Sequence, residues 1–470
     1  MKTGFLSRIL TPVLCLALTA GLFGCAPVDS SSSATPSLTS TQSENSTLQE
    51  SSADSSPPVS SQASSTVSRP SSWTANSSAP ATAYTSSDYW GERFRGQNCL
   101  IEWLAGETDN PAYADIYAVW RHFLRLTDQQ MVSMMFFVTP EQLLGSKKAV
   151  TAADAQAVRK ALQARPVGGL AFFAQNLTDP DQTRSLLNTF TTQAQALGLP
   201  PLFLGVDEEG GRVSRVANTA AFGVTPLPAV SLLQTQQQAY LQGKTIGGYL
   251  KSLGFNLDFA PVADLSNADS SVLNGRTFSG NPTTVRSMAQ QMAKGLRDAG
   301  VLSTYKHFPG HGAVLQDTHD TTAVSQKTWE QLWQNDLIPY LSGQLTTDTE
   351  LVMLGHFACP AITGSQTLPC SLSVDVVTML RDNMHFDGLI ITDALGMTAV
   401  TKQYSSEQAA LTAVRAGVNL LLMPKDFDAA YNALLKAMNT DTQIRYRVFD
   451  SVYRILEYKL GRIRSERNPT

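Results

Sequence analysis

The chain has 470 residues, with 35 lysines and arginines against 39 aspartates and glutamates, and a formal net charge of −4. It contains no basic block, so its composition argues against a nucleic-acid-binding protein. Its length allows a large buried core as well as segments outside the folded domain.

The first 25 residues have the pattern of an export signal. Lys2 and Arg8 precede the apolar run ILTPVLCLALTAGLF, which is the order found in secretory signals and is short for a permanent membrane span. The ending LFGC resembles a bacterial lipobox and predicts that Cys25 becomes the lipidated first residue; an ordinary secretory signal is the alternative. The protein is therefore expected to be exported and held on the outer face of the cell membrane by its lipid alone.

The next two segments precede the main domain. Residues 26–88 consist mainly of Ser, Thr, Pro, Ala and Gln, which offer almost nothing to bury, and they are predicted to form a disordered tether. Residues 89–125 are expected to be an extension that packs on the domain, and residues 126–470 are expected to be the catalytic domain.

Three cysteines remain once the signal and Cys25 are set aside, namely Cys99, Cys359 and Cys370. An odd number leaves at least one thiol unpaired within the chain. Cys359 and Cys370 could pair across a loop, but their spacing alone leaves the pairing open.

Short apolar runs alternate with helix-like segments from residue 134 onward. Runs of this length are typical of strands buried on both faces, and the segments between them have polar starts, three- and four-residue apolar spacing and a final Gly. The eight runs are 134–138, 169–174, 201–207, 257–264, 301–307, 351–356, 388–393 and 419–424. They predict an α/β fold, a (β/α)8 barrel of the TIM type, with a doubly wound open sheet as the alternative.

Polar or charged residues end five of these runs, where a barrel places its active site. They are Asp207, Asp264, the pair Lys306-His307, His356 and Asp393. A single acidic residue at such a place is often only a helix cap, whereas five strand ends of this kind predict a shared site.

Three of the six histidines lie within thirteen positions, in the stretch KHFPGHGAVLQDTHD at 306–320. His307 and His311 have a spacing that zinc ligands can show on a helix. Pro309 and Gly310 argue against a helix there, so neither a metal nor another cofactor is predicted.

An acid–base role fits the end of that stretch better. Asp317 and His319 stand two residues apart, and a carboxylate beside an imidazole fixes its tautomer and raises its basicity. Asp393, at a rigid strand end, would then be the nucleophile, as in retaining glycoside hydrolysis. A solvated loop without chemical function is the alternative for the Asp317–His319 pair.

These motifs together resemble the bacterial β-N-acetylglucosaminidases of glycoside hydrolase family 3. The resemblance extends from LTDQQMVSMMFFV near residue 126 to SVYRILEYKLG near residue 461. It is carried by GVDEEGGRVSR, NLDFAPVADL, GRTFSGNP, KHFPGHGAVLQDTH, VMLGHFACPAI and DGLIITDALGM. The chain departs from the common form at Glu208, where Gln is usual in the family.

The resemblance implies a role for each matching residue. It implies that Asp393 forms the glycosyl-enzyme, and that His319, with Asp317 as its partner, is the acid and later the base. The residues implied to bind the sugar are Asp207, Arg215, Arg276, Lys306 and His307. No chemical role follows for His311.

The implied reaction is the hydrolytic removal of a terminal β-linked N-acetylglucosamine from an amino-sugar oligosaccharide, such as a GlcNAc–MurNAc fragment of peptidoglycan or a chitin fragment. A monomer without cofactor is expected, with the activity confined to the barrel because the chain ends soon after the eighth helix. Two alternatives stay open: a phosphorylase that transfers the sugar to phosphate, and a lipid-anchored sugar-binding protein without catalysis.

Overall fold

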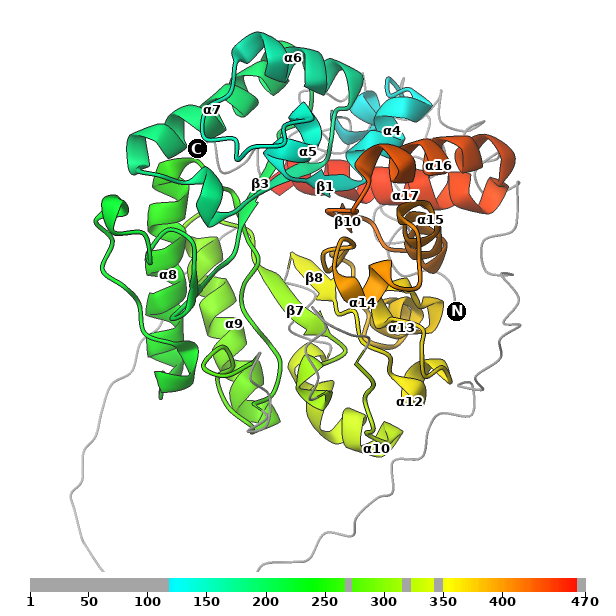
Figure 1. Ribbon diagram of the computed structural model, residues 1–470. Helices are drawn as coiled ribbons and strands as arrows, with labels where there is room; N and C mark the ends of the chain where they lie inside the picture. The colour runs from blue at the N-terminus through cyan, green and yellow to red at the C-terminus, as the bar shows by residue number, and fades with distance from the viewer. Residues whose placement is uncertain (1–117, 267–272, 315–322, 342–349, 463–470) are drawn as a thin grey trace, which may run out of the picture. The chain divides into compact units, whose positions relative to one another are not determined.

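The computed structural model describes residues 118–266, 273–314, 323–341 and 350–462 (Figure 1). Outside these residues lie the predicted signal and tether, residues 89–117 of the extension, Cys25, Cys99, Asp317 and His319. Within the described part of the chain, no helix has the length and apolar character needed to cross a membrane.

Eight parallel strands form the centre of the domain, and each overlaps one of the predicted apolar runs. They are β1 (Phe136–Val138), β2 (Gly169–Phe172), β3 (Phe203–Val206), β6 (Leu257–Asp258), β7 (Thr304–Phe308), β8 (Leu351–Leu354), β9 (Leu389–Thr392) and β10 (Leu421–Leu422). Every residue of these strands is buried, as expected for strands covered on both faces. The predicted α/β class is therefore confirmed.

The strands pair in chain order, with the last strand beside the first. One sheet has the order β10-β1-β2-β3-β6, and a second has the order β7-β8-β9. Isolated parallel bridges link Leu257 to Leu302 and Ile391 to Leu420, between the edges of the two sheets. The continuous ladders thus form two sheets, where the sequence predicted one closed barrel of eight strands.

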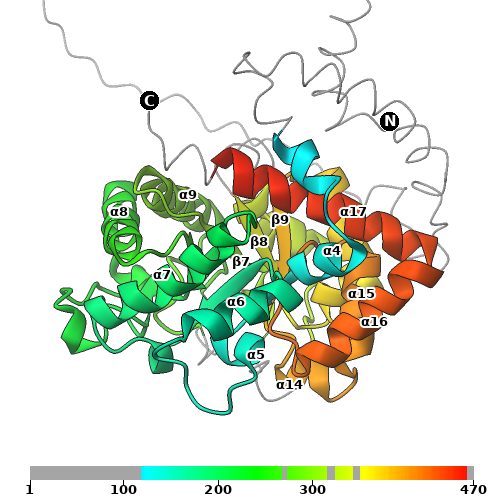
Figure 2. The same ribbon diagram turned by 90° about the horizontal axis from the view of Figure 1, so that it is seen from above.

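The helices lie around the outside of the strands, and seen from above α8 and α9 lie side by side (Figures 1 and 2). The helices are α4 (Asp128–Met134), α5 (Pro140–Leu144), α6 (Ala155–Ala164), α7 (Pro180–Ala196), α8 (Gln236–Leu253), α9 (Pro282–Asp298), α10 (Trp329–Gln331), α12 (Pro360–Thr363), α13 (Val374–Thr378), α14 (Thr398–Thr401), α15 (Ser406–Ala416), α16 (Phe427–Thr440) and α17 (Thr442–Glu457). A short antiparallel pair, β4 (Glu208–Gly210) and β5 (Val213–Ser214), follows β3.

Local sequence explains where these helices begin and end. Asp179 and Asn281 cap α7 and α9 by accepting hydrogen bonds from backbone N–H groups of the first turn. Gly417 ends α15 with a φ of 105°, a left-handed conformation that suits glycine. Gly243 and Gly295 allow α8 and α9 to approach closely, because a Cβ at either position would collide with backbone of the other helix.

The described end of the extension is helical over 118–123 and contacts α17. The ring of Trp120 packs at a tilt against that of Tyr453, with 5.0 Å between ring centroids, and Phe123 meets Phe449 edge to face at 5.8 Å. Both residues of the extension are buried, at 4% and 1% exposure. This short segment therefore belongs to the core of the domain.

Cys359 and Cys370 are both buried free thiols, so the pairing considered from their spacing is not found. They stand on two segments joined by the antiparallel bridge between Ala358 and Pro369. Burial raises the pKa of the Cys370 thiol well above its ordinary value, and an interaction with Cys359 adds to that rise.

We predict that Phe123→Ala lowers the free energy of unfolding by about 3–5 kcal/mol, because it removes a buried aromatic side chain from the contact with α17. Denaturant unfolding followed by circular dichroism measures this. Leu124→Ala is the matched control, since Leu124 is 42% exposed and its loss should change stability by less than about 0.5 kcal/mol. Equal effects of the two substitutions would show that the 118–123 helix does not stabilise the domain.

Candidate active site

The carboxyl ends of the parallel strands gather the polar residues that the sequence singled out. Asp207 follows β3, Lys306 and His307 belong to β7, and Asp393 follows β9. The predicted site residues that the structure describes are linked by direct contacts or by electrostatic interactions. Asp317 and His319 lie outside the described part of the chain.

Lys306 is the buried cation of the site. Its Nζ lies 2.7 Å from Asp207 Oδ1 and 2.7 Å from Glu209 Oε1. Burial opposes its charge, but the two carboxylates outweigh burial and raise the pKa of Lys306, which keeps the ammonium protonated. Arg215 lies farther out, with Nη2 3.9 Å from Asp207 Oδ2 and a side chain that is 32% exposed.

Glu209 completes this network, and sequence reasoning missed it. Its two oxygens accept hydrogen bonds from Nε and Nη2 of Arg276, both at 2.8 Å. Burial opposes ionisation, but Lys306 and Arg276 lower the pKa of Glu209 to about 2. The signal that could have found it is DEEGG, where an acidic residue stands on β4 two positions after Asp207. Two cations and two carboxylates are thus held together with little net charge.

A second acidic pair lies behind the network. The Glu208 carboxylate accepts hydrogen bonds from the N–H groups of Val216 and Ala217, both at 2.9 Å, and from the Tyr249 hydroxyl at 2.8 Å. Asp258 accepts the N–H of Glu208 at 2.9 Å, and burial raises the pKa of both carboxyls, that of Asp258 well above its ordinary value. The Glu208 side chain therefore fixes the backbone of Val216 and Ala217, and Asp258 fixes the backbone of Glu208 itself.

Asp264 orients the histidine-bearing end of β7. Its carboxylate accepts the N–H groups of His307 and His311, at 3.1 and 2.6 Å, and lies 2.7 Å from Nδ1 of His307. Burial opposes ionisation of Asp264, but the neighbouring His307 lowers its pKa, so Nδ1 of His307 is the protonated nitrogen and Nε2 is left for other contacts.

The ring of His311 lies against two other rings. Its ring lies 5.6 Å from the ring of Phe357 and 5.7 Å from that of His307. Burial lowers the pKa of His311 to about 4, so the ring is neutral near pH 7. Among the described residues, no group of three or more His, Cys, Asp or Glu side chains could hold a metal ion.

Asp393 is held as a carboxylate at the end of β9. The N–H of Ala394 donates to Oδ1 at 2.7 Å, and the backbone N–H of Asp393 itself donates to the carbonyl of Leu354 at 2.9 Å. Burial opposes ionisation, but His356, His307, the Ala394 N–H and Lys306 together lower the pKa of Asp393. An ionised, oriented carboxylate that is partly exposed can act as a nucleophile.

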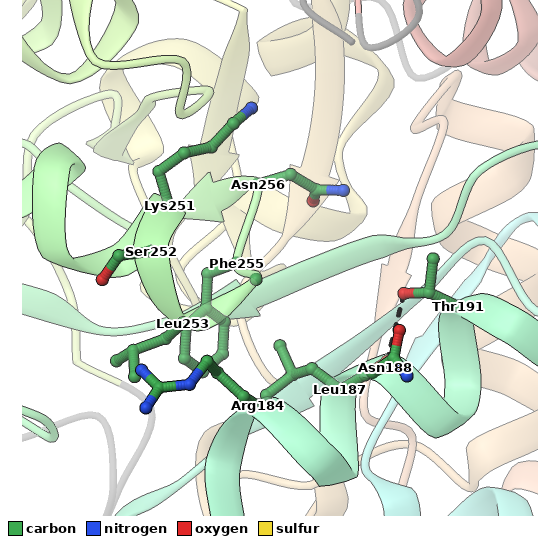
Figure 3. A pocket seen from close by; sticks show the side chains of 10 residues that line it. Arg184, Leu187, Asn188, Thr191, Lys251, Ser252, Leu253, Phe255 and Asn256 are labelled. Atoms are coloured by element: carbon green, nitrogen blue, oxygen red, sulfur yellow. Dashed lines mark hydrogen bonds between the residues drawn. The ribbon is translucent and has the colours of Figure 1, made fainter. Parts of the chain in front are cut away.

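A separate pocket of about 420 Å³ lies between α7 and the segment 251–256 (Figure 3). Arg184, Lys251 and Asn256 are among the side chains that line it. Because residue 256 immediately precedes β6, this pocket is at the end of the strands opposite to Asp264 and contains none of the predicted site residues.

The comparisons with known proteins agree on one family. The Glycosyl hydrolase family 3 N terminal domain matches residues 129–458. Beta-hexosaminidase LpqI of Mycobacterium tuberculosis is 36% identical over 321 residues, which cover 66% of this chain and 79% of that protein. Beta-hexosaminidase A of Pseudoalteromonas piscicida is 31% identical over 317 residues, covering 62% of this chain and only 53% of that protein.

Solved structures give the same picture. A glycoside hydrolase family 3 beta-N-acetylglucosaminidase from Paenibacillus sp. str. FPU-7 superposes with a TM-score of 0.64 and 31% identity, covering 72% of this chain and 63% of that one. The structure of LpqI from M. tuberculosis superposes with a TM-score of 0.61 and 31% identity, covering 71% of this chain and 94% of that one.

We predict that Glu209→Gln destabilises the protein by about 3–5 kcal/mol at pH 7, since it leaves two buried cations short of a carboxylate. The pKa of Glu209 is lowered to about 2, so its ionised form stabilises the fold above its unfolded pKa of about 4.3, and this contribution is lost as the pH falls toward 2. The difference between wild type and variant should therefore shrink below about pH 4.

Urea unfolding of both proteins at pH 7, 5 and 3 measures that difference. Glu330→Gln, at an exposed position on α10, is the control and should cost less than about 0.5 kcal/mol at each pH. A Glu209→Gln penalty that stays constant from pH 7 to pH 3 would show that the carboxylate charge does not stabilise the network.

Proposed function

The chain belongs to glycosyl hydrolase family 3, and from this membership we propose that it is an exo-acting β-N-acetylhexosaminidase that removes a terminal β-linked N-acetylglucosamine with retention of configuration. The observation that carries the proposal is Asp393, an ionised carboxylate fixed at the end of β9 near the network of Lys306 and its acidic partners. The beta-hexosaminidase names of its relatives support the same activity.

The proposed reaction has two steps. The oxygen of Asp393 that does not accept the Ala394 N–H attacks the anomeric carbon, and the bond to the leaving sugar oxygen breaks as that oxygen takes a proton from His319. Water then gives its proton to His319 and its oxygen to the anomeric carbon, which frees Asp393. Asp317 is proposed to orient the His319 ring and to stabilise its charged form.

The described residues on either side of 315–322 support the proposed role of His319. Val314 follows β7 and is buried, and the carbonyl of Ala323 accepts the N–H of Ala358 at 2.8 Å, beyond the end of β8. These two flanking residues therefore lie beside strands whose ends carry site residues. The roles of Asp317 and His319 themselves rest on the sequence motif.

The sugar is proposed to bind against the charged network. Asp207 can accept hydrogen bonds from sugar hydroxyls, while Lys306 already neutralises its charge. Arg276 and His307 are each held by a carboxylate, through Glu209 and Asp264, which fixes their donor and acceptor directions before substrate arrives. Arg215, partly exposed beside Asp207, is proposed to contact the substrate directly.

Further parts of the proposal extend beyond the site. The eight strands are proposed to act as one closed barrel, because they follow in chain order and single bridges join the two sheets. Peptidoglycan fragments are the proposed substrate, and export with a lipid anchor at Cys25 the proposed location, on the basis of the N-terminal sequence pattern. The enzyme is proposed to act as a monomer without cofactor.

We predict that the wild-type chain hydrolyses p-nitrophenyl β-N-acetylglucosaminide much faster than the β-glucoside. Asp393→Ala should lower turnover by about 10⁴-fold or more, since it removes the nucleophile. Asp382→Ala, an exposed aspartate on the preceding helical segment, is the control and should retain full activity. Activity on neither glycoside would contradict the proposed function, and undiminished turnover by Asp393→Ala would contradict its mechanism. Release of the sugar 1-phosphate in phosphate buffer would instead establish a phosphorylase.

We predict that the effect of His319→Ala depends on the leaving group. Sugar leaving groups need a proton and should lose about 10²–10⁴-fold in rate, whereas p-nitrophenolate needs little protonation and should lose far less in the first step. Pre-steady-state release of p-nitrophenol, compared with GlcNAc–MurNAc cleavage, measures both. Equal losses on the two substrates would exclude His319 as the acid.

A further inference from the structure

His356 is a fully buried histidine that follows β8, and the sequence placed it among the strand ends of the predicted site without a role of its own. Its Nδ1 lies 2.7 Å from the hydroxyl of Ser371, and its Nε2 lies 3.0 Å from the carbonyl oxygen of Ala394. A carbonyl oxygen can only accept a hydrogen bond, so Nε2 carries the proton and Nδ1 accepts the Ser371 O–H. Both ring nitrogens are therefore satisfied in one tautomer.

The surroundings keep this ring neutral. Burial lowers the pKa of His356, and His307 acts in the same direction, while Asp393 opposes them without reversing the shift. The Ser371 hydroxyl also favours the neutral form, because it occupies the lone pair that a second proton would need. Near pH 7, His356 is thus a hydrogen-bond donor of fixed direction.

The acceptor of that hydrogen bond is the residue that holds the nucleophile. The N–H of Ala394 donates to Asp393 Oδ1 at 2.7 Å, while the carbonyl of Ala394 accepts from His356. The following N–H groups, of Leu395 and Gly396, donate to β10 and the residue after it at 2.8 and 2.9 Å. Ala394 therefore connects Asp393 to the rest of the site, and His356 fixes the orientation of the Ala394 carbonyl.

Ser371 reaches His356 through a backbone pairing although fifteen residues separate them. The N–H of Ser371 donates to the carbonyl of Gly355 at 3.1 Å, and the N–H of Cys370 donates to that of Phe357 at 2.8 Å. The serine is buried at 0% exposure. Its hydroxyl is therefore held against the histidine ring by the main chain on both sides.

We propose that His356 and Ser371 are positioning residues for Asp393: the serine fixes the histidine tautomer, and the histidine N–H holds the Ala394 carbonyl, which restrains the backbone of the residue whose N–H aims the nucleophile. This inference rests on the proposed function of Asp393. It predicts an effect on the chemical step, since a fixed nucleophile matters most in the transition state, rather than on substrate binding.

His356→Ala is the first test, with the p-nitrophenyl β-N-acetylglucosaminide assay. We expect kcat to fall by about 100-fold, the loss that a small misplacement of a reacting group can cause, with little change in KM. His356→Gln should restore most of kcat, because its amide can donate to the Ala394 carbonyl. Ser371→Ala should lower kcat in the same direction, by less.

Ser373→Ala is the matched control. Ser373 is also fully buried, two residues after Ser371, but its side chain accepts the N–H of Val376 and caps α13. It should lower the thermal unfolding midpoint and leave kcat unchanged. The proposal is overturned if His356→Ala keeps the wild-type kcat while folded, if Gln gives no rescue, or if Ser373→Ala loses as much kcat as Ser371→Ala.

A spectroscopic measurement separates this inference from the proposed function. Nitrogen-15 NMR of the histidine rings in the full chain, with His356 assigned by comparison with His356→Gln, reports which ring nitrogen carries the proton. Protonation at Nε2 in wild type, and its loss or mixing in Ser371→Ala, is expected whether or not the glycoside is a substrate. Protonation at Nδ1 would overturn the pairing, whereas an inactive wild type with the expected tautomer would count only against the proposed function.

Discussion

The burial of the Lys306 ammonium is the constraint on which the rest of the site depends. An ion taken out of water is costly unless other charges and hydrogen bonds replace its hydration. Asp207 and Glu209 do so directly, and Arg276 balances the second carboxylate. With Lys306, these four residues come from three separate parts of the chain, so the charge balance forms only when the strands have assembled. The stability of this network and the proposed binding of substrate therefore depend on the same four side chains.

The sequence predicted the strands and the polar residues at their ends, because both follow from short-range patterns. Runs such as 351–356 begin with an apolar strand, here Leu351–Leu354, since each strand is buried on both faces, and the parallel direction puts their polar ends together. Glu209 was missed because it lies on β4 rather than at the end of a run, and its partner Arg276 is 67 residues away. Whether the ladders close is also not encoded locally, since it depends on single bridges between distant strands.

The hydrogen-bond partners of the histidines are another feature that the sequence alone does not determine. In the sequence, His307 and His311 belong to one cluster, and His356 stands apart as a single strand-end residue. In the fold, each has its own surroundings: Asp264 lies beside His307, burial lowers the pKa of His311, and Ser371 and the Ala394 carbonyl bind the two ring nitrogens of His356. Proximity along the chain identified the histidine cluster, but the hydrogen-bond partner of each ring decides which nitrogen can donate.

The nucleophile and the acid–base residue of the proposed retaining reaction have different requirements. The described residues bear on those of the nucleophile. A nucleophile must stay ionised and keep one direction, and the proposed nucleophile Asp393 has a lowered pKa and a side chain held by the Ala394 N–H. An acid–base residue must instead give a proton in one step and take one in the next. The proposed acid, His319, lies outside the described part of the chain. The described residues supply the fixed direction of the proposed nucleophile, because hydrogen bonds to Ala394, Leu395 and Gly396 hold the backbone that follows Asp393.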